Sequence, residues 1–196
     1  PGSAAPVPLM FQNIAGSMCG ALLPSGRAVD VIEGVACTLI DNGMPCVIIR
    51  ADAFGLTGRE SREALDADTA LKARIEAIRL KAGPLMALGD VAQKSVPKMT
   101  LVSAPTAGGT IATRSFIPHR CHAGIGVFAA VSVATACTLP GSPAADLAHL
   151  PTGGRFLIEH PTGAAEVLVD QDAQGTVTGA GTLRTARKIM DGWVFP

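Results

Sequence analysis

Residues 121–137 read CHAGIGVFAAVSVATAC, and this stretch decides the fold. Nearly every position is small or apolar, and no polar stripe marks a side that would face solvent. A helix of this composition is stable only when neighbouring elements cover it on all sides. The sequence therefore predicts a central apolar helix that is wrapped by other parts of the chain.

The segments around this helix are typical of short strands. With 22 glycines and 14 prolines the chain turns often, and apolar runs alternate with turn signals. A Thr-x-x-Glu capping box at Thr57 predicts a helix start, and a surface helix is expected over residues 71–82. The fold class predicted is α+β. The expected strands are 8–11, 17–23, 28–32, 35–40, 45–51, 99–104, 110–117, 155–159, 164–170, 176–182, 184–190 and 193–195.

Composition excludes several partners. The 16 basic residues balance 16 acidic ones and only 4% of the chain is aromatic, so no nucleic-acid surface is predicted. The uncharged stretches 1–26 and 121–145 are interrupted by prolines or polar residues, so neither is predicted to span a membrane. Five widely spaced cysteines without a CxxC pair indicate a reducing compartment, and we expect a cytoplasmic protein.

Two stretches are candidates for binding. In residues 118–126, PHRCHAGIG, polar and basic residues lead into the predicted helix start, where free N–H groups and the helix dipole favour a carboxylate or phosphate. The alternative is that the glycines only permit close packing and the histidines lie on the surface. In residues 159–163, EHPTG, a tight turn brings an imidazole and a hydroxyl together, although such a turn is more often a plain hairpin.

Other chemistries find little support in the sequence. His119, Cys121 and His122 lie close together, but no second ligand cluster accompanies them, so we predict no metal site. A Gly-x-Ser-x-Gly elbow and a GxGxxG loop are both missing, and no cofactor is expected. Cys121 near a helix start is either a thiol with a lowered pKa or a small buried packing residue, and the second interpretation is favoured.

Five motifs occur in an order that resembles a known family. They are GSMCGALLPSG (16–26), IDNGMPCVIIRA (40–51), PHRCHAGIGVFAAVSVATACTLPGS (118–142), IEHPTG (158–163) and RTARKIMDGWVFP (184–196). The chain resembles the 4-oxalomesaconate tautomerases and 2-methylaconitate cis-trans isomerases. The resemblance corresponds to about the C-terminal half of a family member, so an N-terminal half with the main acid and base is expected to be missing.

The resemblance implies a diaminopimelate-epimerase-like fold, in which a β-barrel-like sheet wraps a central helix, here residues 121–137. It also implies three parts: residues 1–30 as strands at the junction with the missing domain, 31–182 as the C-terminal domain, and 183–196 as strands returning to the missing domain. The partners implied are a small tricarboxylate, the missing half of the same protein, and a second copy in a homodimer.

The activity implied is a cofactor-independent keto–enol tautomerisation or 1,3-allylic proton shift of 4-oxalomesaconate, in the breakdown of gallate- or protocatechuate-type aromatic acids. The alternatives are 2-methylaconitate isomerisation and a non-catalytic half that only binds carboxylates. Epimerase relatives carry a cysteine where this chain has Ala123, so no catalytic residue is assigned. The expected substrate contacts are Arg120, His122, Ala123, Gly124, Ile125, His160 and Thr162, with Asn42, Met44, Arg184 and Arg187 as weaker candidates.

Overall fold

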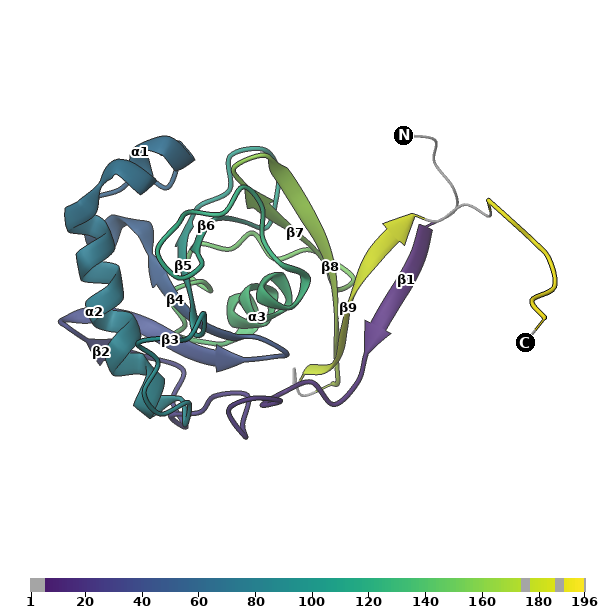
Figure 1. Cartoon of the computed structure of the whole chain (residues 1–196), viewed down its shortest axis with the longest axis horizontal. Helices are drawn as coiled ribbons and strands as arrows, with labels where there is room; N and C mark the ends of the chain where they lie inside the picture. The colour runs from purple at the N-terminus through teal and green to yellow at the C-terminus, as the bar shows by residue number, and fades with distance from the viewer. Residues whose placement is uncertain (1–5, 174–176, 186–188, 196) are drawn as a thin grey trace.

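A computed structural model describes residues 6–173, 177–185 and 189–195 of the chain. Within these residues the backbone forms one mixed sheet together with three α-helices and one 3₁₀ helix (Figure 1). The strands are β1 (Pro6–Phe11), β2 (Asp30–Ile32), β3 (Val35–Asp41), β4 (Pro45–Arg50), β5 (Lys98–Ser103), β6 (Ile111–Phe116), β7 (Arg155–His160), β8 (Gly163–Gln171) and β9 (Val177–Thr185). The helices are η1 (Ala51–Phe54), α1 (Arg62–Ala67), α2 (Thr69–Leu85) and α3 (Val127–Thr138).

The sheet has the strand order β1-β9-β8-β7-β6-β5-β4-β3-β2. Most neighbours are antiparallel, but β4 pairs with β5 and β6 pairs with β7 in parallel. A parallel pair needs a crossover connection, and here α1 and α2 form the first crossover and α3 forms the second. The two crossovers lie on opposite faces of the sheet, because Leu101 packs in the core with α2 whereas its neighbour Val102 packs in the core with α3.

The helix α3 is the centre of one of the two hydrophobic cores. It contacts β3, β4, β7, β8 and β9, and nine of its residues, Ala129 to Cys137, are buried. Figure 1 shows α3 viewed nearly end-on inside a ring of strands, while β1 and β9 form a ribbon that extends away from it. The prediction of a central apolar helix is therefore confirmed, although the sheet order is open, with β1 and β2 at its two ends.

The central helix begins later than predicted. It starts at Val127 instead of residue 121 because Cys121 forms a β-bridge with Phe116, and the N–H of His122 donates to the carbonyl of Ser115 over 2.8 Å. These pairings hold the chain extended beside β6. The helix can begin only after the chain has left that strand.

Strand predictions are also wrong for residues 17–23 and 193–195, and the predicted strand 184–190 is absent at 189–190. Residues 17–23 form turns because the buried carboxylate of Asp41 accepts the N–H groups of Met18 and Cys19, each over 2.8 Å. At the C-terminal end, β9 continues to Thr185, but residues 189–195 contain no strand. Residues 186–188 of that predicted strand lie outside the described part of the chain.

Only the Glu60 half of the capping box at Thr57 forms, and no helix starts there. Glu60 accepts hydrogen bonds from the N–H (2.7 Å) and the hydroxyl (2.8 Å) of Thr57, which closes a turn. The helices begin later, at N-caps provided by the side chains of Ser61 for α1 and Asp68 for α2. None of the helices in the described residues has the length and hydropathy needed to span a bilayer.

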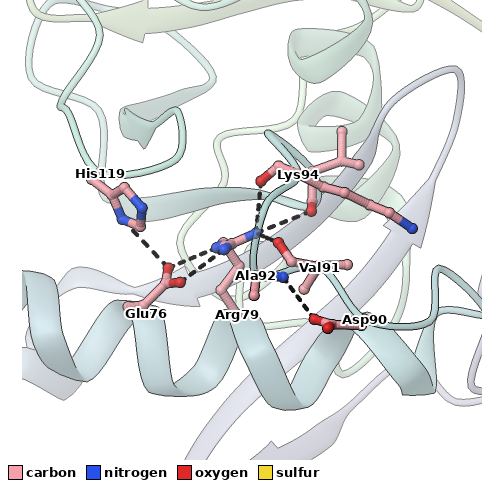
Figure 2. Close-up of polar contacts among 8 residues, drawn as sticks. Glu76, Arg79, Asp90, Val91, Ala92, Lys94 and His119 are labelled. Carbon is pink, nitrogen blue, oxygen red and sulfur yellow. Dashed lines mark hydrogen bonds and ion pairs between the residues drawn. The ribbon is translucent and has the colours of Figure 1, made fainter.

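A fully buried arginine fixes α2 to the loop before β5. Figure 2 shows Arg79 between Glu76 on the same helix, at 2.7 and 2.8 Å, and the loop carbonyls of Val91 and Lys94, at 2.9 and 3.0 Å. His119 lies 3.5 Å from the same glutamate. A buried cation is tolerated when a carboxylate and several carbonyls satisfy it, so this cluster is structural.

Candidate functional site

The predicted binding residues meet where the β7–β8 turn touches the segment that leads into α3. Thr162 Oγ1 donates to the carbonyl of Ala123 over 2.9 Å and lies 3.4 Å from His160 Nδ1. A Cβ atom placed on Gly124 would lie 3.7 Å from His160 Cε1, which is ordinary contact distance. Four of the seven predicted residues, Ala123, Gly124, His160 and Thr162, therefore form one cluster.

His160 is the titratable group of this cluster. Burial lowers its pKa, a hydrogen bond with the Ala123 backbone works in the opposite direction, and the charge of Arg114 lowers it further. The net effect is a pKa below the usual range, so the imidazole is neutral at pH 7. A neutral imidazole has one N–H, and with that N–H on the Ala123 backbone its other nitrogen can accept a hydrogen bond or a proton from a substrate.

The free N–H groups of the helix start lie further along the chain than predicted. The first hydrogen bond within α3 runs from the N–H of Ala130 to the carbonyl of Gly126 over 2.8 Å. The N–H groups of Val127, Phe128 and Ala129 thus have no acceptor within the helix, and the N-cap residue Gly126 supplies no side-chain cap. These three residues lie beyond Ala123, Gly124 and Ile125, whose N–H groups were predicted to bind an anion and which precede the helix.

The other predicted contacts are not brought into the cluster by any contact that the structure records. Ile125 packs against the core around α3. His122 uses its backbone to pair with Ser115, and its side chain is exposed. Arg120 is exposed at the tip of the hairpin after β6, where its carbonyl accepts the N–H of Ile117 over 3.0 Å.

The weaker candidates have structural positions. Asn42 is buried and donates through Nδ2 to Thr135 Oγ1 of α3 over 2.9 Å, while the carbonyl of Met44 accepts from Ser132 Oγ over 2.8 Å. These contacts fasten the β3–β4 turn to the central helix. Arg184 lies in β9 opposite Val7, and Arg187 lies outside the described residues.

Cys121 is a packing residue. Its side chain is 1% exposed, and burial together with the charge of Asp66 raises the pKa of the thiol to about 11. A thiol in this state is protonated at neutral pH and is a poor nucleophile or base. Among the described residues, no three His, Cys, Asp or Glu side chains gather as metal ligands.

A pocket of about 520 Å³, lined in part by His160 of the cluster, was missed by the sequence analysis. Its walls include Arg59 from the turn before α1, Thr106 from the loop after β5, and Arg114 from β6. These residues come from three separate segments. The sequence offers no local motif that joins them, because the pocket arises only when the sheet brings the segments together.

The fold itself is found in a solved enzyme structure. A crystal structure of methylitaconate-delta-isomerase superimposes with a TM-score of 0.89 at 24% identity, covering 99% of this chain and 56% of that one. The fold is thus the diaminopimelate-epimerase-like fold that the resemblance implied.

Sequence comparison gives the family. A family model described as PrpF protein matches residues 1–196, and the chain belongs to the PrpF family. It is 60% identical to a (4E)-oxalomesaconate Delta-isomerase of Novosphingobium over all of its length, and 55% identical to a 4-oxalomesaconate tautomerase of Pseudomonas putida over 99% of its length. A 2-methyl-aconitate isomerase of Shewanella oneidensis is 31% identical over 97% of the chain. The chain spans about half the length of these relatives, namely 55%, 54% and 55%.

Proposed function

We propose that the protein is a cofactor-independent isomerase that tautomerises 4-oxalomesaconate by moving one proton. The observation that carries this proposal is the gradient of identity. The chain is 60% and 55% identical to the two relatives named for oxalomesaconate, but only 31% and 29% identical to two relatives named for 2-methylaconitate. The gradient therefore favours oxalomesaconate over 2-methylaconitate.

The described cluster suits the binding part of such a reaction. The unpaired N–H groups at the start of α3 can hold a substrate carboxylate, and the positive end of the helix dipole stabilises the same charge. Thr162 fixes the turn, and the unprotonated nitrogen of neutral His160 can accept a hydrogen bond from the hydroxyl of an enol form of the substrate. The proposal retains Arg120 and His122 as substrate contacts at the exposed edge of the site.

The proton transfer needs an acid–base pair that the described residues do not supply at this cluster. A base removes the proton from the acidic carbon, and an acid returns one proton to the other end of the conjugated system. The position where epimerase relatives carry a thiol is Ala123, and Cys121 is protonated and buried. We therefore assign the acid and base to the part of the relatives' length that this chain does not span.

We infer the domain organisation in the same way. Residues 31–182 form the C-terminal domain with a barrel-like sheet around α3, and residues 1–30 and 183–196 pair with the rest of the protein. Support comes from the β1–β9 ribbon, which carries Val7, Leu9 and Met10 with 39%, 44% and 41% exposure. The partners proposed are a small tricarboxylate, the N-terminal half of the protein and a second copy of the protein. We also propose that the protein is located in the cytoplasm.

Two assays test this function on the whole protein. Incubation with 4-oxalomesaconate in D₂O should give rapid isomerisation with solvent deuterium incorporated at the reacting carbon, and 2-methylaconitate should react far more slowly. Faster turnover of 2-methylaconitate would support the alternative isomerase. Absence of proton exchange with either compound, together with retained binding, would support a protein that only binds carboxylates.

A further inference from the structure

The peptide group that leads into His160 is held by a buried threonine of the neighbouring strand. The register of the parallel strands β6 and β7 ends at the pair Ala112–Glu159. One residue further along β6, the hydroxyl of Thr113 donates to the carbonyl of Glu159 over 2.7 Å, and Thr113 is buried. A side chain therefore continues the link between the two strands up to the peptide group that joins Glu159 to His160.

The side chain of Glu159 holds the same point of β7 from a second direction. It accepts the N–H groups of Thr106, Ala107 and Gly109, each over 2.8 Å. Burial works to raise the pKa of Glu159, but these hydrogen bonds outweigh it and hold the pKa below the usual range, so the carboxylate is ionised. Hydrogen bonds to an ionised group are stronger than those between neutral groups. Glu159 is thus fixed both through its side chain and through its carbonyl.

His160 follows this anchored residue directly and opens the β7–β8 turn. It pairs with Gly163, so two residues, Pro161 and Thr162, lie between the strands. A two-residue turn has little conformational freedom of its own, because its backbone must match the twist of both strands. The position of the imidazole beside the Ala123 backbone therefore depends on the peptide group through which the chain enters the turn.

A buried threonine can also bind a carbonyl for stability alone, and Thr182 is an example. Its hydroxyl donates to the carbonyl of Glu166 over 2.8 Å, which links β9 to β8, and neither residue lines the pocket that contains His160. Thr113 forms the same kind of bond, but at the peptide group that leads directly into the titratable residue of the site. Comparison of the two threonines therefore separates a positioning effect from a general loss of stability.

We propose that Thr113 is a positioning residue of the candidate site, and that its hydroxyl holds His160 in place for the substrate by binding the carbonyl of Glu159. The proposal rests on the proposed function in taking His160 as a substrate contact. Without the hydroxyl, the entry to the β7–β8 turn loosens. The imidazole then moves away from the Ala123 backbone and toward solvent.

An NMR titration of the His160 ring in the whole protein tests this proposal without relying on turnover, and the ring signal is assigned by its loss in His160→Gln. Burial and the charge of Arg114 hold the pKa of His160 below its usual range, against the hydrogen bond with the Ala123 backbone. The other charged residues that line the same pocket are Arg59 and Glu159. Exposure of the imidazole would remove the largest of these effects, which is burial.

Thr113→Val should therefore raise the pKa of His160 toward about 6.5, the value of an unperturbed histidine. Thr113→Ser should bring the pKa back toward that of the unaltered protein, because serine retains the hydroxyl. Thr182→Val is the matched control. It removes the same kind of bond outside the site, so it should lower the free energy of unfolding and leave the pKa of His160 unchanged.

Steady-state kinetics with 4-oxalomesaconate give a second measurement. Thr113→Val should raise KM by about fivefold and keep kcat within about twofold, because His160 is assigned to binding and the acid and base lie elsewhere. Thr182→Val should leave KM unchanged. If the protein turns over neither 4-oxalomesaconate nor 2-methylaconitate, the proposed function fails, and the NMR titration still decides whether Thr113 positions His160.

Two results would overturn the proposal. An unchanged pKa of His160 in Thr113→Val would mean that the bond to Glu159 serves stability alone. An equal change of this pKa in Thr182→Val would mean that general loosening of the sheet is the cause. Thr113→Ala also lacks the hydroxyl and adds no bulk, so it replaces the valine variant if that variant does not fold, and the same two results then apply.

Discussion

The hydroxyl of Thr162 donates a hydrogen bond over 2.9 Å to the carbonyl of Ala123, which lies 39 positions earlier in the chain. This bond joins the β7–β8 turn to the segment that enters the central helix. The same junction places His160 beside Gly124, where an added Cβ atom would lie 3.7 Å from the imidazole Cε1. The candidate site is therefore assembled by long-range hydrogen bonds of Thr162 and His160 with the Ala123 backbone.

Replacing Thr162 with valine should raise the KM of the whole enzyme by about fivefold, which corresponds to the loss of one hydrogen bond of about 1 kcal/mol. Thr162 is exposed, so the free energy of unfolding should change little. Steady-state kinetics and urea unfolding measure the two effects. Thr152→Val, at an exposed turn position, is the matched control and should leave KM unchanged; an unchanged KM in Thr162→Val would remove this residue from the site.

Gly124 should accept alanine but not valine. A single Cβ lies 3.7 Å from His160 Cε1, which is ordinary contact, whereas the two further methyl groups of valine would displace the imidazole. We expect Gly124→Ala to stay within about twofold of the original KM and Gly124→Val to raise KM by at least tenfold. Equal KM values for the two variants would show that the space beside His160 is not used by the substrate.

Cys121 should be dispensable for turnover. Its thiol is 1% exposed with a pKa of about 11, so Cys121→Ala should keep kcat and lower only the free energy of unfolding, by about 1 kcal/mol. Iodoacetamide at pH 8 should label Cys121 in urea far faster than in the native protein. A large loss of kcat in Cys121→Ala would restore this thiol to an acid–base role.

The sequence predicts the centre of this fold because the signal there is local. Residues 121–137 contain no polar stripe, and nearly the whole of α3 is buried as expected. Strands such as β3 and β4 are equally clear, since apolar runs end at turn signals. In each case the information that fixes the element lies within the element itself.

The failures arise where distant residues decide the local structure. Residues 17–23 look like a strand, but the carboxylate of Asp41 captures their N–H groups. The helix start moves to Val127 because Cys121 pairs with Phe116. The pocket lined by Arg59 is formed by three segments that are distant in sequence. No residue spacing along the chain predicts that these segments meet.

Glu159→Gln should destabilise the protein in a way that depends on pH. The lowered pKa of Glu159 means that its carboxylate contributes stability above the pKa of an unfolded glutamate, about 4.3, and loses that contribution as the pH falls through the lower folded value. Glutamine at this position would also place its NH₂ group against backbone N–H groups, and two donors cannot form a hydrogen bond with each other. We expect a loss of about 2 kcal/mol at pH 7 that shrinks as the pH falls below 4.3.

Urea unfolding of both proteins at pH 7 and at pH 3.5 measures this difference. Glu63→Gln is the control, because Glu63 is exposed in the first turn of α1 and should show a small effect at both pH values. A difference for Glu159→Gln that stays constant between the two pH values would contradict the assignment, since the loss would then come from packing. A difference that falls with pH would show that the ionised carboxylate holds the loop of Thr106, Ala107 and Gly109. Thr106 and Ala107 of this loop also line the pocket that His160 borders.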